Sequence, residues 1–286
     1  MRVHRWTCFF VLFLWTCSAV VESANVLSVC SNCTHTTINS AVVSAGPGDI
    51  IIIAPGNYNE PQTSIGFPLT FQATDGDVCV STTSTYYTTW LIINSVLTLN
   101  GSFTTNGACL EVPGALYQYG TLIMVPAIRA IYLNQGQWHQ YGHVHLISAG
   151  GANGIINLSG IWDQYGTVLL EATGETGVFL GVFSGPPGVW NQYGSAELVV
   201  LHGNGLVTQD TFACAWRQEG TLKVTALSTS NGVVLNTGAT WTQLNSSVFT
   251  VDDQSNGVSL AGAWTQQSSV NMTIRDRSVG THTEPY

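Results

Sequence analysis

Residues 190–200 read WNQYGSAELVV, and the opening phrase of this stretch recurs along the chain. An apolar residue, any residue and then Gln occur together seven times: Leu116-Tyr117-Gln118, Trp138-His139-Gln140, Trp162-Asp163-Gln164, Trp190-Asn191-Gln192, Trp216-Arg217-Gln218, Trp241-Thr242-Gln243 and Trp264-Thr265-Gln266. Successive Gln positions are 22 to 28 residues apart. A unit of this length cannot bury its own apolar face, so it must stack on a neighbouring unit. The repeat therefore predicts a solenoid.

Each unit also contains a second phrase and two further short segments. Upstream of the Trp lies Asn-Gly or a close variant, as at Asn204-Gly205, and the Gln is followed within two residues by Gly in most copies. The segments between these points alternate apolar and polar residues over four or five positions, as strands do. Asn and Gly tolerate positive φ, so we expect them at the corners. A coil of about 25 residues with three short strands predicts an all-β protein built as one parallel β-helix.

The parity of the repeat assigns its side chains to two faces. The Trp and the Gln are two residues apart and therefore share one face of the strand. The residue between them varies freely and includes Asp163 and Arg217, as expected of an outward position. We therefore expect a buried Trp stack and a buried Gln column whose amides hydrogen-bond from coil to coil in a ladder.

The N-terminal residues have the pattern of an export signal. Residues 1–23 contain Arg2 and Arg5, then an apolar run and a small-residue site at Ser23, which predicts a signal peptide. A retained signal anchor is the alternative, and no other run is long enough to span a membrane. The chain is acidic, with a net charge of −9, which argues against nucleic acid and anionic membrane surfaces as partners. We expect a secreted or extracellular surface protein.

Residues 24–47 are expected to cap the solenoid, residues 48–275 to form it, and residues 276–286 to be a polar tail. Within the cap, Ile38, Ala41, Val42 and Ala45 lie on one face of a short helix. A helix at this place would cover the open core and the free strand edge of the first coil.

The segment from Thr36 to Glu60 resembles the opening of right-handed parallel β-helices of the pectin lyase-like superfamily. The matching residues are Thr37-Ile38, Ala41, Ala45, Gly48-Asp49, Ile51, Ile53, Pro55-Gly56, Tyr58 and Glu60. The Trp-x-Gln-x-Gly units resemble the repeats of secreted adhesin β-helices. Together the resemblances cover about residues 36–275 and imply a right-handed β-helix. That superfamily includes lyases, hydrolases and plain adhesins, so they imply no single activity.

The enzyme motifs of the superfamily are not evident in this chain. Galacturonan hydrolases of this fold carry Asn-Thr-Asp, Asp-Asp and Gly-His-Gly, whereas this chain has only Asp252-Asp253, and Gly142-His143-Val144 departs from the last motif. We therefore expect a non-catalytic, adhesin-like or glycan-binding protein. A polysaccharide lyase or glycoside hydrolase is the alternative, and two carboxylates at glycosidase spacing in a groove would favour it.

Cysteines and sequons carry the remaining local signals. Cys30 and Cys33 are expected to form a disulfide near the cap, since the chain is predicted to be exported. Parity places Cys109 outside and Cys214 inside, so these two should not pair. A zinc site would need a second ligand pair at suitable spacing, and none is evident, so we expect no metal and no cofactor. N-glycosylation sequons occur at Asn32, Asn100, Asn157, Asn245 and Asn271.

Two outward columns are the candidate functional residues. Between Trp and Gln lie Tyr117, His139, Asp163, Asn191 and Arg217, which should be about one strand spacing apart, about 4.8 Å. His139 and Asp163 could then form an acid–base pair, and Asp163 and Arg217 could lie on either side of a sugar. The alternative is a solvated polar strip whose charges pair incidentally.

Two residues further on is a column of tyrosines, Tyr119, Tyr141, Tyr165 and Tyr193. Together with Tyr117 these rings could stack on sugars or anchor a cell-surface partner. The alternative is that the rings only stabilise the sheet through contacts between neighbouring strands. The longest variable loops, residues 181–188 and 208–213, precede Trp190 and Trp216 and flank the same columns.

Overall fold

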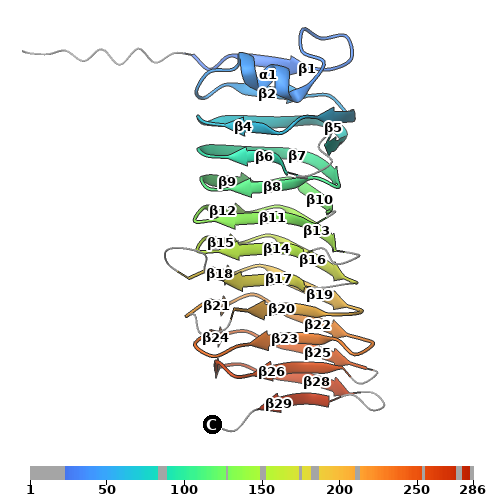
Figure 1. Ribbon diagram of the computed structural model, residues 1–286, viewed down its shortest axis with the longest axis vertical. Helices are drawn as coiled ribbons and strands as arrows, with labels where there is room; N and C mark the ends of the chain where they lie inside the picture. Colours follow the sequence, from blue (N-terminus) through green and yellow to red (C-terminus); the bar gives the residue numbers. More distant parts are fainter. Residues whose placement is uncertain are drawn as a thin grey trace, which may run out of the picture.

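The fold is a right-handed parallel β-solenoid of about nine turns, with about 24 residues per coil and one short helix (Figure 1). The computed structural model describes residues 23–82, 89–126, 128–148, 153–173, 176–181, 187–209, 213–252, 255–274 and 279–283. The solenoid predicted from the Trp-x-Gln repeat is confirmed. No helix in these ranges is long and apolar enough to cross a membrane. The predicted signal peptide lies outside them apart from Ser23.

Each regular coil contains three strands, and each strand pairs in parallel with its equivalent in the next coil. The Trp-x-Gln strands are β9 (Ala115–Gln118), β12 (Gln137–Gln140), β15 (Ile161–Gln164), β18 (Val189–Gln192), β21 (Ala215–Gln218), β24 (Thr240–Gln243) and β27 (Ala263–Gln266). The strands that follow them are β10 (Thr121–Val125), β13 (His143–Ser148), β16 (Thr167–Ala172), β19 (Ser195–Val200), β22 (Leu222–Ala226), β25 (Ser247–Val251) and β28 (Val270–Ile274).

The third series forms a separate sheet of ten strands along the opposite side of the coil. Its members are β4 (Thr63–Ile65), β6 (Thr89–Ile93), β8 (Cys109–Val112), β11 (Arg129–Asn134), β14 (Asn153–Leu158), β17 (Thr176–Gly181), β20 (Asn204–Thr208), β23 (Asn231–Leu235), β26 (Asn256–Leu260) and β29 (Val279–Thr283). β29 pairs with β26, so the solenoid continues into the segment expected to be a polar tail.

The first coils contain β1 (Val26–Val29), β2 (Ile50–Ile53), β3 (Gly56–Glu60), β5 (Leu69–Thr82) and β7 (Val96–Asn106). β5 and β7 are long strands, and each takes the place of two short strands in a later coil. β7 pairs with both β9 and β10 and so passes through the corner without a break. Gly101 permits this course, because its φ is +99° and a Cβ there would lie 2.7 Å from that of Ala73.

The N-terminal end is capped as expected. Helix α1 (Ile38–Ser44) begins at Thr37, whose side chain accepts a hydrogen bond from the Ser40 N–H, and it buries Ile38, Ala41 and Val42. The buried carboxylate of Glu60 accepts hydrogen bonds from the first two amides of the helix, Ile38 N at 2.8 Å and Asn39 N at 2.9 Å. β1 precedes α1 and pairs with β2, so the solenoid starts before residue 48.

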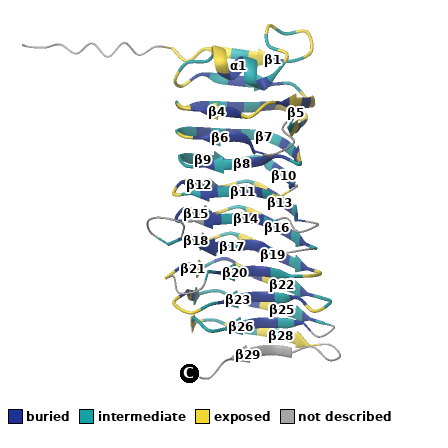
Figure 2. Cartoon of the chain, in the orientation of Figure 1, coloured by how far each residue is buried: buried dark blue, intermediate teal, exposed yellow. Residues whose placement is uncertain are grey.

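The predicted Trp column fills the core. From Trp138 to Trp264 the rings of successive coils stack with centroids 4.5–5.0 Å apart. The Trp residues from Trp138 to Trp241 and the Gln residues from Gln118 to Gln243 are buried. In the last coil Trp264 is only half-buried and Gln266 is exposed, contrary to expectation. Among the described residues, no further coil stacks on β27 and β28, and β28 is among the exposed segments in Figure 2.

The Gln column is buried, but its amides do not bond to one another. Gln164 Nε2 donates to the carbonyl oxygens of Gly166 in its own coil (2.7 Å) and Ser195 in the next (2.9 Å). The other Gln side chains from 118 to 243 repeat this arrangement. Each corner leaves backbone carbonyls that need a donor, and the Gln amide provides it. The expected side-chain ladder is therefore wrong for Gln.

A side-chain amide ladder does occur, at the Asn-Gly phrase. Asn231 Nδ2 donates to Asn204 Oδ1, and Asn256 Nδ2 donates to Asn231 Oδ1, each at 2.8 Å. These Asn residues begin β20, β23 and β26 and do not form a corner as expected. Where amides on neighbouring coils align, they satisfy each other along the solenoid axis.

Close approach between coils explains the glycines that follow the tyrosines. Gly142 does not have the positive φ expected at a corner. A Cβ on Gly142 would lie 1.9 Å from the carbonyl oxygen of Gly120 in the preceding coil, and one on Gly166 would lie equally close to that of Gly142. Glycine is needed here for space and not for φ.

Candidate functional site

The candidate site lies on the outer surface of the Trp-x-Gln strands from β9 to β21. The register aligns Tyr117, His139, Asp163, Asn191 and Arg217 in one row along the axis, which we call the polar column. Just after each strand ends, Tyr119, Tyr141, Tyr165 and Tyr193 form a second row, the tyrosine column. Both columns lie where the sequence placed them.

The four rings of the tyrosine column form one continuous stack. Neighbouring ring centroids are 4.9, 5.0 and 4.8 Å apart and the rings are within 8° of parallel. Each side chain is still 38–50% exposed. Partial desolvation in the stack raises the pKa of Tyr141 above its ordinary value of 10.0, with further contributions from Tyr119 and Tyr165. Partial desolvation and the negative charge of Asp163 raise the pKa of Tyr165.

Stacking decides which part of each ring a ligand can reach. A ring in contact with another needs a separation of about 3.5–4.0 Å, so a sugar inserted between two tyrosines would require them to be about 7–8 Å apart. The observed spacing of about 5 Å excludes insertion. The interior rings of Tyr141 and Tyr165 therefore offer ring edges and hydroxyl groups to a ligand, because their faces are covered by the neighbouring rings.

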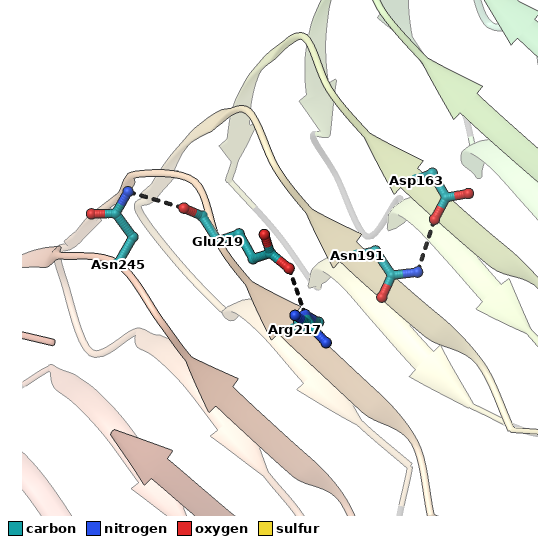
Figure 3. A network of polar contacts seen from close by, with 5 residues as sticks. All are labelled: Asp163, Asn191, Arg217, Glu219 and Asn245. Carbon is teal, nitrogen blue, oxygen red and sulfur yellow. Dashed lines mark hydrogen bonds and ion pairs between the residues drawn. The ribbon is translucent and has the colours of Figure 1, made fainter. Parts of the chain in front are cut away.

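The polar column contains the acid–base pair that the sequence predicted. His139 Nδ1 is 3.2 Å from Asp163 Oδ2, and the His139 ring stacks on Tyr117 with centroids 4.7 Å apart. Asn191 Nδ2 donates to Asp163 Oδ1 at 2.8 Å (Figure 3). The carboxylate of Asp163 thus has a partner on each oxygen.

Arg217 belongs to a different contact. Its Nε donates to Glu219 Oε1 at 2.6 Å, and the Arg217 and Glu219 side chains are 56% and 35% exposed. Figure 3 shows the Arg217–Glu219 pair apart from the Asp163–Asn191 pair. The expectation that Asp163 and Arg217 act together across a sugar gains no support from these contacts. Among the described residues, no three His, Cys, Asp or Glu side chains are grouped as a metal site requires.

A groove lies beside the tyrosine column, and the sequence analysis did not identify it. It has a volume of about 520 Å³ and crosses the strands from β13 to β25. One side is a row of small polar residues at the first positions of these strands or just before them, His143, Thr167, Ser195, Thr221 and Ser246. The other side is formed by Leu169, Glu197, Lys223 and Val248. We call the four Ser and Thr residues of the first row, Thr167, Ser195, Thr221 and Ser246, the hydroxyl row.

The groove contains one ion pair and one close polar contact at its end. Lys223 Nζ donates to Glu197 Oε1 at 2.6 Å, and both side chains are largely exposed. His143 Nδ1 and Thr167 Oγ1 are 2.6 Å apart. The sequence signal for the groove was the small hydroxyl residue that follows Tyr-Gly or Glu-Gly in most coils, as in Tyr165-Gly166-Thr167, although His143 follows Tyr141-Gly142.

The five sequons differ in accessibility. Asn32 and Asn271 are exposed, and Asn100 and Asn245 are half-buried. Asn157 is buried; its side chain donates to the Val189 carbonyl at 2.9 Å and accepts from the Gly160 N–H at 3.0 Å. The amide of Asn157 is therefore enclosed in the folded chain, and glycosylation at all five sequons stays a prediction.

The cysteines follow the sequence analysis in part. Cys30 and Cys33 form the expected disulfide, and Cys79, Cys109 and Cys214 are free. Cys109 is buried, contrary to the parity prediction, and burial raises the pKa of its thiol to about 12. Parity fails here because two successive residues at the start of this strand are buried, Cys109 and Leu110, as are Ala130 and Ile131 at the equivalent positions of the next coil.

No protein-family model, no curated protein and no solved structure matches this chain. The sequence and the geometry of this surface are therefore the basis for assigning a function.

Proposed function

We propose that this protein is a secreted or cell-surface, non-catalytic β-solenoid, adhesin-like, that binds a glycan on a cell surface or wall. The observation that carries the proposal is the tyrosine column, four aromatic side chains that stay 38–50% exposed on consecutive coils. Contiguous exposed aromatic surface on a soluble protein is typical of interaction sites. The predicted signal peptide and the exposed sequons support an extracellular location, and the resemblance to pectin lyase-like β-helices supports a carbohydrate ligand.

The polar groups beside the tyrosines favour binding over catalysis. Both oxygens of Asp163 are occupied by His139 and Asn191, and Arg217 is paired with Glu219. A glycosidase needs one carboxyl group free to protonate the leaving oxygen and a second across the bond. The net charge of −9 argues against nucleic acid as the partner.

The test combines a glycan array with a polysaccharide-degradation screen on the secreted protein. We expect binding without turnover. The double substitution Tyr141→Ala and Tyr165→Ala should weaken binding about tenfold or more, because it removes two ring edges and two hydroxyl groups, and each hydrogen bond contributes roughly 0.5–1.5 kcal/mol. Tyr141→Phe with Tyr165→Phe keeps the stack and removes only the hydroxyl groups, so it separates their contribution to binding from that of the ring edges. Turnover that disappears with His139→Ala or Asp163→Ala would show an enzyme; wild-type binding by the Tyr-to-Ala variant would exclude the tyrosine column as the binding surface.

A further inference from the structure

We infer that the groove beside the tyrosine column binds a linear, uncharged polysaccharide whose chain lies along the solenoid axis. This inference rests on the proposed function and specifies the class of ligand and the site at which it binds. The groove crosses five consecutive coils, from His143 on β13 to Val248 on β25, so its long direction follows the stacking of the coils.

The hydroxyl row gives the groove a repeat that a polymer can match. Thr167, Ser195, Thr221 and Ser246 each place one hydroxyl on a successive coil, and the coils are about 4.8 Å apart. A hydroxyl group both donates and accepts a hydrogen bond, as sugar hydroxyls do. A chain of hydroxylated units along the axis would meet a hydroxyl group on each of these four coils, with the Thr167 hydroxyl also in contact with His143, whereas a compact ligand would contact only one or two of them.

The charges in the groove favour an uncharged chain. Glu197 and Lys223 neutralise each other at 2.6 Å across two coils, so neither needs a charged ligand. The whole chain has a net charge of −9, which repels an acidic polymer. Leu169 and Val248 add apolar surface on the same side, against which the carbon-bound hydrogens of a sugar can pack.

A polypeptide fits this groove less well. Peptides commonly bind sheets by adding a strand to a free edge. Here the backbone N–H and C=O groups of β13, β16, β19, β22 and β25 point along the axis and pair with the neighbouring coils. An extended peptide in the groove would contact side chains but no free backbone hydrogen-bonding groups, so a sugar chain is the favoured ligand.

Affinity electrophoresis tests the inference with two soluble probes, a mixed-linkage β-glucan as the uncharged linear chain and polygalacturonate as the acidic one. We expect the glucan to retard the wild-type protein and polygalacturonate to retard it at least tenfold less. Ser195→Tyr fills the groove at its centre and should weaken glucan binding at least tenfold. Thr240→Tyr, at an exposed position of β24 outside the groove, is the matched control and should bind as wild type.

Thermal unfolding of each variant shows whether the fold is intact, and Thr221→Tyr repeats the test one coil further on if Ser195→Tyr does not fold. Wild-type glucan binding by a folded groove-filling variant would overturn the groove assignment. If the groove-filling variant bound glucan normally but Tyr141→Ala with Tyr165→Ala abolished binding, the proposed function would stand, and the groove would not be the binding site. Stronger binding to polygalacturonate would overturn the uncharged class, and binding to neither probe nor to any other polysaccharide would remove both the inference and the proposed function.

Discussion

At the scale of single residues, the Trp and the Gln of each coil have separate roles. Trp190 packs on the rings of Trp162 and Trp216, so one side chain links its own coil to the coils on both sides. Gln192 bonds to the backbone at the corner and, through Oε1, accepts from Trp216 Nε1 at 3.3 Å. Trp therefore supplies apolar burial, and Gln satisfies the polar groups that the corner leaves in the core.

The difference between an inner and a terminal Trp gives a first prediction. Trp190→Ala should reduce the free energy of unfolding by about 3–5 kcal/mol, because a buried ring is lost and a cavity remains. Trp264→Ala should cost clearly less, because that ring is only half-buried and packs on one side. Urea unfolding followed by circular dichroism measures both. Equal losses would contradict the assignment of Trp264 to an open end.

The free cysteines give a second prediction. At pH 8, iodoacetamide should label Cys79 well before Cys109 or Cys214, because Cys79 is half-buried and the other two are buried with raised pKa values. Mass spectrometry of the intact and digested protein gives the order of labelling. In urea all three thiols should react at similar rates, which controls for intrinsic reactivity. Rapid labelling of Cys109 in the folded chain would show that β8 opens locally.

At the scale of the element, the tyrosine column shows what parity can and cannot predict. Parity gave the outward face and the spacing of Tyr119, Tyr141, Tyr165 and Tyr193, because those follow from strand geometry alone. It could not give the ring orientation, which depends on χ angles chosen to stack neighbouring rings. Because of that orientation, the interior tyrosines expose their ring edges. The sequence alone therefore could not predict how these rings contact a ligand.

The stack predicts a specific response to alkaline pH. The folded-state pKa values of Tyr141 and Tyr165 are raised, so between pH 10 and those values the two phenols keep protons that the unfolded chain releases. Their contribution to stability is complete below pH 10 and is lost as pH rises through the folded-state pKa values. Absorbance at 295 nm should show tyrosines titrating above pH 10, and Tyr141→Phe with Tyr165→Phe should remove part of that high-pH phase. An unchanged titration curve in this variant would contradict the raised pKa values.

At the scale of the whole molecule, the sequence predicted the features that repeat in every coil and missed those that several coils form together. The Trp column, the strands, the helix at Ile38–Ser44 and the His139–Asp163 contact follow from period and parity. The groove depends on two rows of side chains across five coils, and no single unit contains it. The bonding of the Gln amides depends on corner carbonyls whose positions the sequence pattern does not fix. The two variable loops lie largely outside the described residues, and the expectation that they border the site stays a prediction.

The two ends of the solenoid are covered differently, and this asymmetry should appear in its dynamics. At the N-terminal end α1 packs against β1 and β2, and the Cys30–Cys33 disulfide closes the adjoining turn. At the other end, within the described residues, β29 pairs with β26 alone, and Ile274 on β28 remains 49% exposed. In a solenoid each coil is stabilised by its own contacts and by the neighbours on its two sides. A coil with a neighbour on one side has the lower free energy of local opening.

Hydrogen exchange followed by mass spectrometry measures this opening along the chain. We expect the amides of β27 and β28 to exchange fastest, those of β15 and β16 slowest, and those of β2 at a rate nearer the centre than the C-terminal end. β2 is the internal control, since it lies near an end but is covered. Uniform exchange along the solenoid would mean that the coils open together as one cooperative unit. Faster exchange in β2 than in β28 would mean that the helix does not protect the first coil, and would contradict the role assigned to α1.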